Sequence, residues 1–243
     1  GTSTARRAPR TASWRAAKAA ATRYMSPQGG TPAAAQEVVS LYLTALADAR
    51  VAQGEELLAA FSRTRQAAQE LGAFLAEAAG PAGSGADPEE AVAALVRTWQ
   101  PEDGSLEAAV VRVALGQTLR SALSSPTTGA PDRAAREVGR FLAAVLHCRL
   151  LLDLGEPLEA AAPGARTFRR RLDLQGEIIK AAAAAALAAA GPPPPPDRWR
   201  GLAGWLWLSR LLTAMWDTLR GRGGSAGAAA SVSKHQRPPG TRG

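Results

Sequence analysis

Apolar residues recur at steps of three and four along most of this 243-residue chain, a spacing that places them on one side of an α-helix. The clearest stripe follows Pro131 and consists of Val138, Phe141, Val145, Cys148 and Leu152. Only 5% of the residues are aromatic, and the apolar residues are mainly Ala, Leu and Val, which favours closely spaced helices over β-sheets. We therefore expect an all-α protein.

Capping residues, glycines and prolines mark where these helices begin and end. Thr31-Pro32 predicts a helix start, because Thr caps free N–H groups and Pro is tolerated at the first helical position. From there the pattern predicts one long helix, or two joined near Gly54, ending at about Ala79. Further starts are expected at Asp87 and at Ser105.

The helix after Pro131 is expected to close at Gly155 and Pro157, and a fifth helix to begin near Thr167. That fifth helix runs into AAAAAALAAAG, which has high helix propensity but little side-chain area to bury. It either lets another helix approach closely or separates two parts of the chain. The following GPPPPP favours the spacer, since polyproline extends as a stiff rod of about 3 Å per residue.

The predicted organisation is a bundle of about five amphipathic helices with basic extensions. Residues 1–30 have the composition of a basic transit-like or disordered segment, in which one face would hold Trp14, Ala17, Ala21 and Tyr24. The remaining divisions are an α-helical bundle over 31–190, a polyproline linker over 191–197, a Trp-rich amphipathic helix over 198–222 and a disordered basic tail over 223–243.

The net charge of +8 is unevenly distributed. Residues 1–36 carry +6 and residues 198–243 carry +7, which leaves the stretch 37–197 at −5. An acidic body argues against a nucleic-acid-binding globular surface, whereas the basic ends suit RNA phosphates or anionic lipid.

Side chains that commonly perform catalysis or bind metal are scarce. The chain has one cysteine and two histidines. His147 and Cys148 are adjacent, and neighbours on a helix point about 100° apart, so they cannot act as a ligand pair on one face. Cys148 is interpreted as a packed thiol and His147 as a flanking helix residue. We expect no enzyme activity, no cofactor, no metal and no small-molecule substrate.

One basic run stands out in the body, and it consists of Arg166, Arg169, Arg170 and Arg171. It occupies the predicted first turn of the fifth helix, where positive charge opposes the helix dipole. Contact with phosphate or with an acidic partner would explain this unfavourable placement. The alternative is a solvated helix face whose charges are screened.

Four of the six tryptophans lie between Gly191 and Arg222. A helix here would place Trp205, Leu208, Leu212, Met215, Trp216 and Leu219 on one face. Its apolar part spans about 24 Å, which is too short for a bilayer core. Three interpretations remain: a sixth core helix, a helix at a membrane interface, or a helix docked on a partner protein. The proline rod favours an outward, docking role.

We accordingly expect a non-enzymatic scaffold or assembly subunit of a larger complex, docked on a protein partner or membrane surface through the Trp-rich helix. The transit-like segment suggests a mitochondrion or chloroplast, whereas a disordered basic tail would suit the cytoplasm or nucleus. The alternative function is peripheral, ribosome-associated RNA binding through the basic tails.

Overall fold

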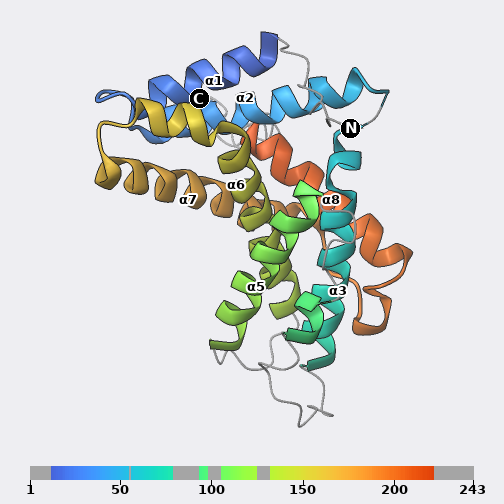
Figure 1. Ribbon diagram of the computed structural model, residues 1–243. Helices are drawn as coiled ribbons and strands as arrows, with labels where there is room; N and C mark the ends of the chain where they lie inside the picture. Colours follow the sequence, from blue (N-terminus) through green and yellow to red (C-terminus); the bar gives the residue numbers. More distant parts are fainter. Residues whose placement is uncertain (1–11, 55, 79–92, 98–104, 125–131, 222–243) are drawn as a thin grey trace, which may run out of the picture.

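The computed structural model describes residues 12–54, 56–78, 93–97, 105–124 and 132–221, and within these ranges the only regular elements are helices (Figure 1). The all-α prediction is confirmed. The elements are α1 (Ala12–Met25), α2 (Pro32–Val51), η1 (Leu57–Phe61), α3 (Ser62–Ala78), α5 (Leu106–Ser124), α6 (Arg133–Ala161), α7 (Ala165–Ala190), η2 (Pro196–Arg198) and α8 (Leu202–Leu219), with a short helical piece over 93–97.

The helices form two groups that share α6. At one end α1 and α2 pack together, α1 contacts α6 and α2 contacts α7; at the other end α3 and α5 pack on α6 and on each other (Figure 1). The last helix, α8, packs mainly along α7 and also contacts α3 and α2. In this described part of the chain no helix is both long enough and apolar enough to cross a lipid bilayer.

Two predicted helix starts are confirmed by their caps. The Ala34 amide donates a 3.2 Å hydrogen bond to the Thr31 side-chain oxygen, and Pro32 occupies the first position of α2. The Ala108 amide donates a 3.3 Å hydrogen bond to the Ser105 hydroxyl at the start of α5. Each cap joins two residues that are three apart in sequence, so both caps could be predicted without knowledge of the tertiary structure.

The helix ends agree with the sequence predictions less well than the helix starts do. Of the two predictions for residues 32–78, two helices joined near Gly54 is the one confirmed, because Gly54 adopts a positive φ of 73° between α2 and η1. The predicted end at Gly155 and Pro157 is wrong, since α6 continues to Ala161 with Pro157 inside it. A proline removes one backbone hydrogen bond, and burial of Leu154 and Leu158 on either side holds the helix together.

The N-terminal helix α1 belongs to the core. Ala17, Ala21 and Tyr24 are buried on the predicted shared face, and the half-buried Trp14 ring meets Tyr42 of α2 edge-on at 5.9 Å between centroids. The disordered alternative is therefore wrong for residues 12–25. The predictions for residues 1–11, for the link and helix start over 80–90, for the break over 125–131 and for the tail over 223–243 lie outside the described residues.

The alanine run allows close helix packing. One side of α7 is buried at Ala182, Ala183, Ala186 and Ala190, and α8 runs back along this helix. The Trp207 indole N–H donates a 3.1 Å hydrogen bond to the Gly191 carbonyl oxygen, which ties the start of the proline segment to α8. The spacer interpretation is thus wrong, because the prolines turn the chain back toward the bundle.

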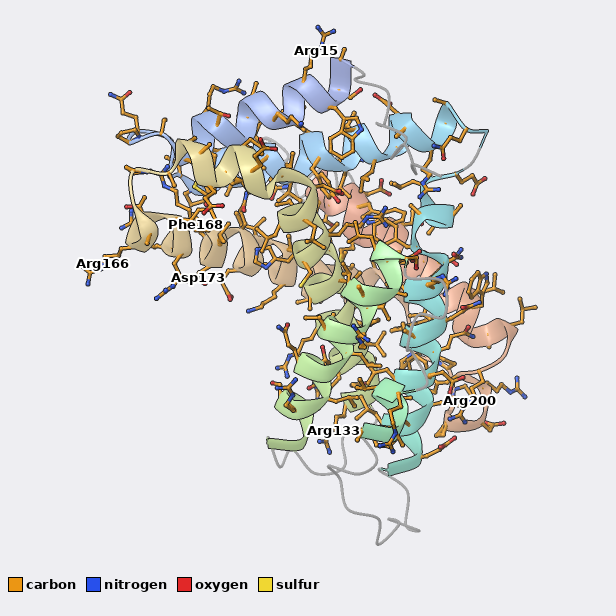
Figure 2. All side chains as sticks on the ribbon, in the orientation of Figure 1. Arg15, Arg133, Arg166, Phe168, Asp173 and Arg200 are labelled. Carbon is orange, nitrogen blue, oxygen red and sulfur yellow. The ribbon has the colours of Figure 1, made fainter. Side chains whose placement is uncertain are left out.

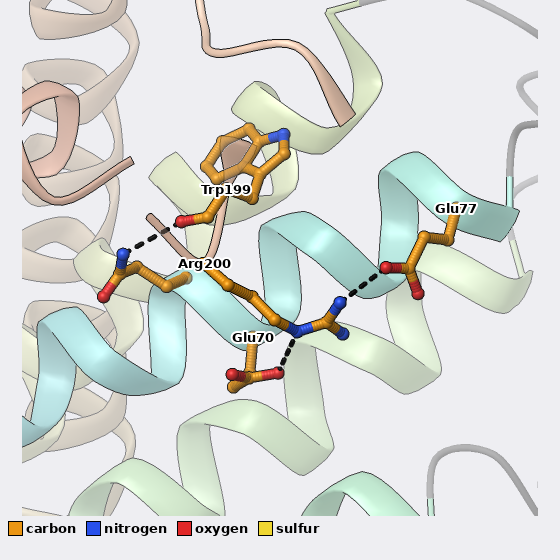
Figure 3. Close-up of polar contacts among 5 residues, drawn as sticks. Glu70, Glu77, Trp199 and Arg200 are labelled. Carbon is orange, nitrogen blue, oxygen red and sulfur yellow. Dashed lines mark hydrogen bonds and ion pairs between the residues drawn. The ribbon is translucent and has the colours of Figure 1, made fainter. Parts of the chain in front are cut away.

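Polar contacts hold the returning segment on α3 (Figure 3). The Gln69 side-chain amide donates to the carbonyl oxygens of Trp199 and Gly201, at 2.9 and 3.0 Å. Arg200 reaches across the surface of α3 to Glu70 at 2.8 Å and Glu77 at 2.6 Å. The buried Trp199 ring packs edge-on against Trp207 at 5.3 Å, so this corner of the core is made of two indoles.

Candidate functional site

The predicted docking face of the Trp-rich helix lies in the protein's own core. Five of its six residues are buried, and these are Leu208, Leu212, Met215, Trp216 and Leu219. They pack among α2, α3 and α7, the helices that α8 contacts. The prediction that this face docks on a partner is therefore wrong. The apolar area that a partner would have covered is already removed from water by packing within the chain.

The sixth residue, Trp205, is half-buried beneath Arg65 of α3. The Arg65 guanidinium carbon lies 3.7 Å from the centre of the indole, a cation–π contact. The same guanidinium donates a 2.9 Å hydrogen bond to the Ser209 hydroxyl, and burial lowers the pKa of Arg65. The large apolar side chains that α8 leaves in solvent are Leu202 and Leu206, 72% and 52% exposed, which were not in the predicted set.

The predicted arginine run divides into one structural residue and three surface residues. Arg171 is only 3% exposed and donates to three backbone carbonyl oxygens at the end of α1 and beyond it: those of Tyr24, Ser26 and Pro27. Its guanidinium therefore caps the C-terminal end of α1, where carbonyl oxygens lack helical partners.

Arg166, Arg169 and Arg170 are exposed, and Arg166 projects from the start of α7 (Figure 2). None of the three forms an ion pair with another residue of the described ranges. Gly164 precedes the helix without a side-chain cap, and the first turn holds no acidic residue. Because α7 begins at Ala165, the prediction that the run occupies the first turn holds for Arg166 alone, where the helix end carries partial positive charge, and Arg169 and Arg170 lie in the second turn. We call these three residues the arginine surface.

A groove opens where α5 and α7 diverge from α6. Both helices pack on α6. The groove has a volume of about 1350 Å³. Its α5 side presents polar residues such as Gln117 and Ser121. Its α7 side presents alanines and Leu187 together with the charged residues Glu177 and Lys180, and the lining also includes Pro192, Pro193 and Trp207.

Glu137 of α6 lines this groove and is only 5% exposed. One carboxylate oxygen, Oε1, accepts a 2.7 Å hydrogen bond from Arg140. The other, Oε2, is buried and has no hydrogen-bond partner among the residues described here. A buried carboxylate oxygen without a donor is costly, so this atom calls for an explanation.

His147 and Cys148 have packing environments consistent with the sequence interpretation. The His147 ring lies against Gly176 of α7, where an added Cβ would come within 3.2 Å of the ring. Burial lowers the pKa of His147, and Lys180 lowers it further. Burial also raises the pKa of the half-buried Cys148 thiol. Across the described ranges no cluster of three or more His, Cys, Asp or Glu residues could hold a metal ion.

Sequence reasoning missed Glu137, although a signal exists. Glu137 lies three residues after Ala134 and four before Phe141, both of which are buried. A carboxylate at helical spacing from two core residues must itself face inward.

The comparisons with known proteins identify no family. No family model, no curated protein and no solved structure matches this chain.

Proposed function

We propose that this protein is a non-enzymatic helical scaffold subunit that binds an acidic surface of a partner protein through Arg166, Arg169 and Arg170. The observation that carries the proposal is the arginine surface itself: three exposed guanidinium groups without ion pairs among the described residues, placed at the start of α7. Larger complexes in organelles are the setting in which we expect this subunit to act.

The position of these arginines has a cost within the isolated chain. Arg166 lies in the first turn of α7, where a positive side chain opposes the dipole by about 0.3–1 kcal/mol at low ionic strength, and the effect on Arg169 and Arg170, one turn further on, is smaller. Carboxylates of a partner would reverse the sign of this interaction and would also meet the free N–H groups of the first turn. Binding thus relieves a local repulsion as well as forming ion pairs.

The fold supports this role by holding the arginine surface rigidly. Arg171 fastens the same turn of α7 to the end of α1, and α8 covers the apolar side of α7. A preorganised set of charges loses less conformational entropy on binding than the same charges on a mobile segment.

The test reverses the three charges together, as Arg166→Glu, Arg169→Glu and Arg170→Glu. The matched control reverses three exposed charges elsewhere, as Lys18→Glu, Arg112→Glu and Arg210→Glu. Tagged chains are expressed in the protein's own cells, and copurifying proteins are quantified by mass spectrometry. We expect the first variant to lose a set of acidic partners by about tenfold or more, and the control to keep them.

Binding to the purified partner should weaken as salt rises, because the contact is electrostatic. The proposal fails if both variants keep the same partners. It also fails if the material lost from the first variant is RNA, which would support the alternative of RNA binding. Imaging of the tagged chain in the same cells tests the expected mitochondrial or chloroplast location.

A further inference from the structure

The proline segment between α7 and α8 has a backbone that its own sequence fixes. Residues 192–196 are five consecutive prolines, which we call the proline rod. Each ring holds φ near about −65°, and each proline that precedes another is restricted to an extended ψ of about 120–160°. Pro195 has φ −61° and ψ 159°. These are the angles of a polyproline II helix, so the proline rod is a short helix of that type.

One edge of the proline rod faces solvent. A polyproline II helix has about three residues per turn, so Pro192 and Pro195 lie on the same edge, about 9 Å apart. Both residues are exposed, whereas Pro193 and Pro194 between them are half-buried. Two prolines separated by two residues on one open edge are the pattern that proline-binding domains recognise.

The backbone of the proline rod also offers free hydrogen-bond acceptors. Among the residues that the structure describes, no group donates to the carbonyl oxygens of Pro192, Pro193 or Pro194. The grooves that bind polyproline II helices are lined by aromatic side chains. Trp and Tyr in such a groove pack against proline rings and can donate an N–H or O–H to these oxygens. The proline rod therefore matches an aromatic groove in both its apolar and its polar groups.

The fold holds the proline rod at both ends before any partner binds. At its start, the Trp207 indole donates to the Gly191 carbonyl oxygen. Just beyond its end, the Gln69 amide donates to the carbonyl oxygens of Trp199 and Gly201. A segment that is already ordered loses less conformational entropy on binding, which favours its use as a docking site.

Arg198 adds a charged group next to the proline rod. It follows Pro195 by three residues, and its side chain is 70% exposed. Within the described ranges its ion pair is a 4.0 Å contact with the neighbouring Asp197, which is itself 79% exposed, and such surface pairs contribute little. Arg200, by contrast, already bridges two carboxylates of α3. Arg198 is thus available to a carboxylate beside an aromatic groove, and this contact would fix the direction in which the rod lies.

We propose that the proline rod and Arg198 form the docking site for a partner protein domain that binds polyproline II helices in an aromatic-lined groove with a carboxylate at its edge. The proposal goes beyond the arginine surface and does not depend on it, since the two sites lie at opposite ends of α7 and share no residue.

The first experiment removes the exposed edge. Pro192→Ala combined with Pro195→Ala deletes both outer rings, and the matched control combines Pro27→Ala with Pro163→Ala, two exposed prolines outside the proline rod. Tagged full chains are expressed in the protein's own cells, and copurifying proteins are quantified by mass spectrometry. Circular dichroism of the purified chains checks that both variants fold.

We expect the first variant to lose, by about tenfold or more, a partner that contains a domain with an aromatic-lined groove, and the control to keep it. The proposal is overturned if the first variant keeps every partner of the unmodified chain. It is also overturned if the lost partner binds through a domain without such a groove, or if the lost material is nucleic acid.

The second experiment measures the contact with purified components. The domain found in this way is titrated by calorimetry with the full chain, with Arg198→Glu, and with Arg112→Glu, an exposed arginine of α5, as the control. We expect Arg198→Glu to weaken binding by about tenfold or more and Arg112→Glu to leave it unchanged. The free peptide GPPPPPDR should compete for the domain, but more weakly than the full chain, because its ends are not anchored.

A variant of the partner keeps the test independent of folding in this chain. Replacing an aromatic residue of the partner's groove by Ala should weaken binding by about tenfold or more. Unchanged affinity of that variant, failure of the peptide to compete, or equal effects of Arg198→Glu and Arg112→Glu would each overturn the proposal. Charge reversal of the arginine surface should leave this binding intact, and its loss there would assign the partner to the arginine surface instead.

Discussion

The Tyr24 hydroxyl donates a 2.8 Å hydrogen bond to the Arg171 carbonyl oxygen, while the Arg171 guanidinium donates to the Tyr24 carbonyl oxygen. These residues are 147 positions apart, and the reciprocal bonds join the end of α1 to the start of α7. Burial raises the pKa of Tyr24 to about 12, against the opposing effect of the positive charge on Arg171. The phenol therefore stays a neutral donor at physiological pH.

This pairing predicts that Arg171→Ala destabilises the fold by about 2–4 kcal/mol, because the buried Tyr24 carbonyl oxygen and the part-buried contacts to Ser26 and Pro27 lose a charged donor. Urea unfolding followed by circular dichroism measures the change. Arg170→Ala, at the adjacent exposed position, should stay within about 0.5 kcal/mol of the unmodified chain. Equal effects of the two substitutions would show that the cap on α1 contributes little.

Two helical glycines predict opposite effects of the same substitution. A Cβ on Gly72 would collide with the buried Trp199 ring, so Gly72→Ala should destabilise by about 1–3 kcal/mol. A Cβ on Gly155 meets no atom within 4 Å, so Gly155→Ala should stabilise by about 0.5–1 kcal/mol through helix propensity. Thermal unfolding of both variants checks the signs. A stable Gly72→Ala variant would mean that Trp199 does not pack tightly on α3.

His147 predicts a dependence of stability on pH. Its pKa in the folded chain lies below the ordinary value of 6.5, chiefly because the ring is buried. Well above pH 6.5 the ring is neutral in both states, and as the pH falls through 6.5 the unfolded chain binds a proton that the folded chain resists. Stability should therefore fall between pH 6.5 and the folded pKa.

Urea unfolding between pH 5 and 8, for the unmodified chain and for His147→Gln, measures this contribution. As the pH falls through that window, the free energy of unfolding of the unmodified chain should decrease relative to that of His147→Gln. A difference that does not vary with pH would contradict the burial of a neutral imidazole between α6 and α7.

Cys148 should react slowly with thiol reagents. Burial raises the pKa of its thiol, and the thiolate is the reactive form. We expect alkylation by iodoacetamide at pH 8 to be at least about tenfold slower in the folded chain than in urea. The control is the Cys148→Ser chain, which should take up no label. Equal rates in the two conditions would show that the thiol is open to solvent.

Local features of this protein could be predicted from its sequence because they depend on neighbouring residues. The helical class follows from apolar spacing, and the caps at Thr31 and Ser105 act over three residues. The shared face of α1 and the first part of the stripe in α6, at Val138, Phe141 and Val145, are likewise visible as periods of three and four. The prediction is wrong for Leu152, which is 56% exposed, because the buried side of α6 passes to Leu150, Leu154 and Leu158. The helix end at Pro157 was missed, because burial of flanking leucines outweighs one lost hydrogen bond.

Tertiary structure alone decided where α8 lies and what the polar side chains do. The sequence of the apolar face around Leu212 and Met215 is equally compatible with packing on α7 and with packing on a partner. The proline segment before it could lead the chain back to the bundle or away from it. The roles of Arg171 and Glu137 likewise depend on residues brought together from distant parts of the chain or from facing helices. Spacing determines which side of a helix is apolar, whereas the partner of that side is determined by how all the helices pack.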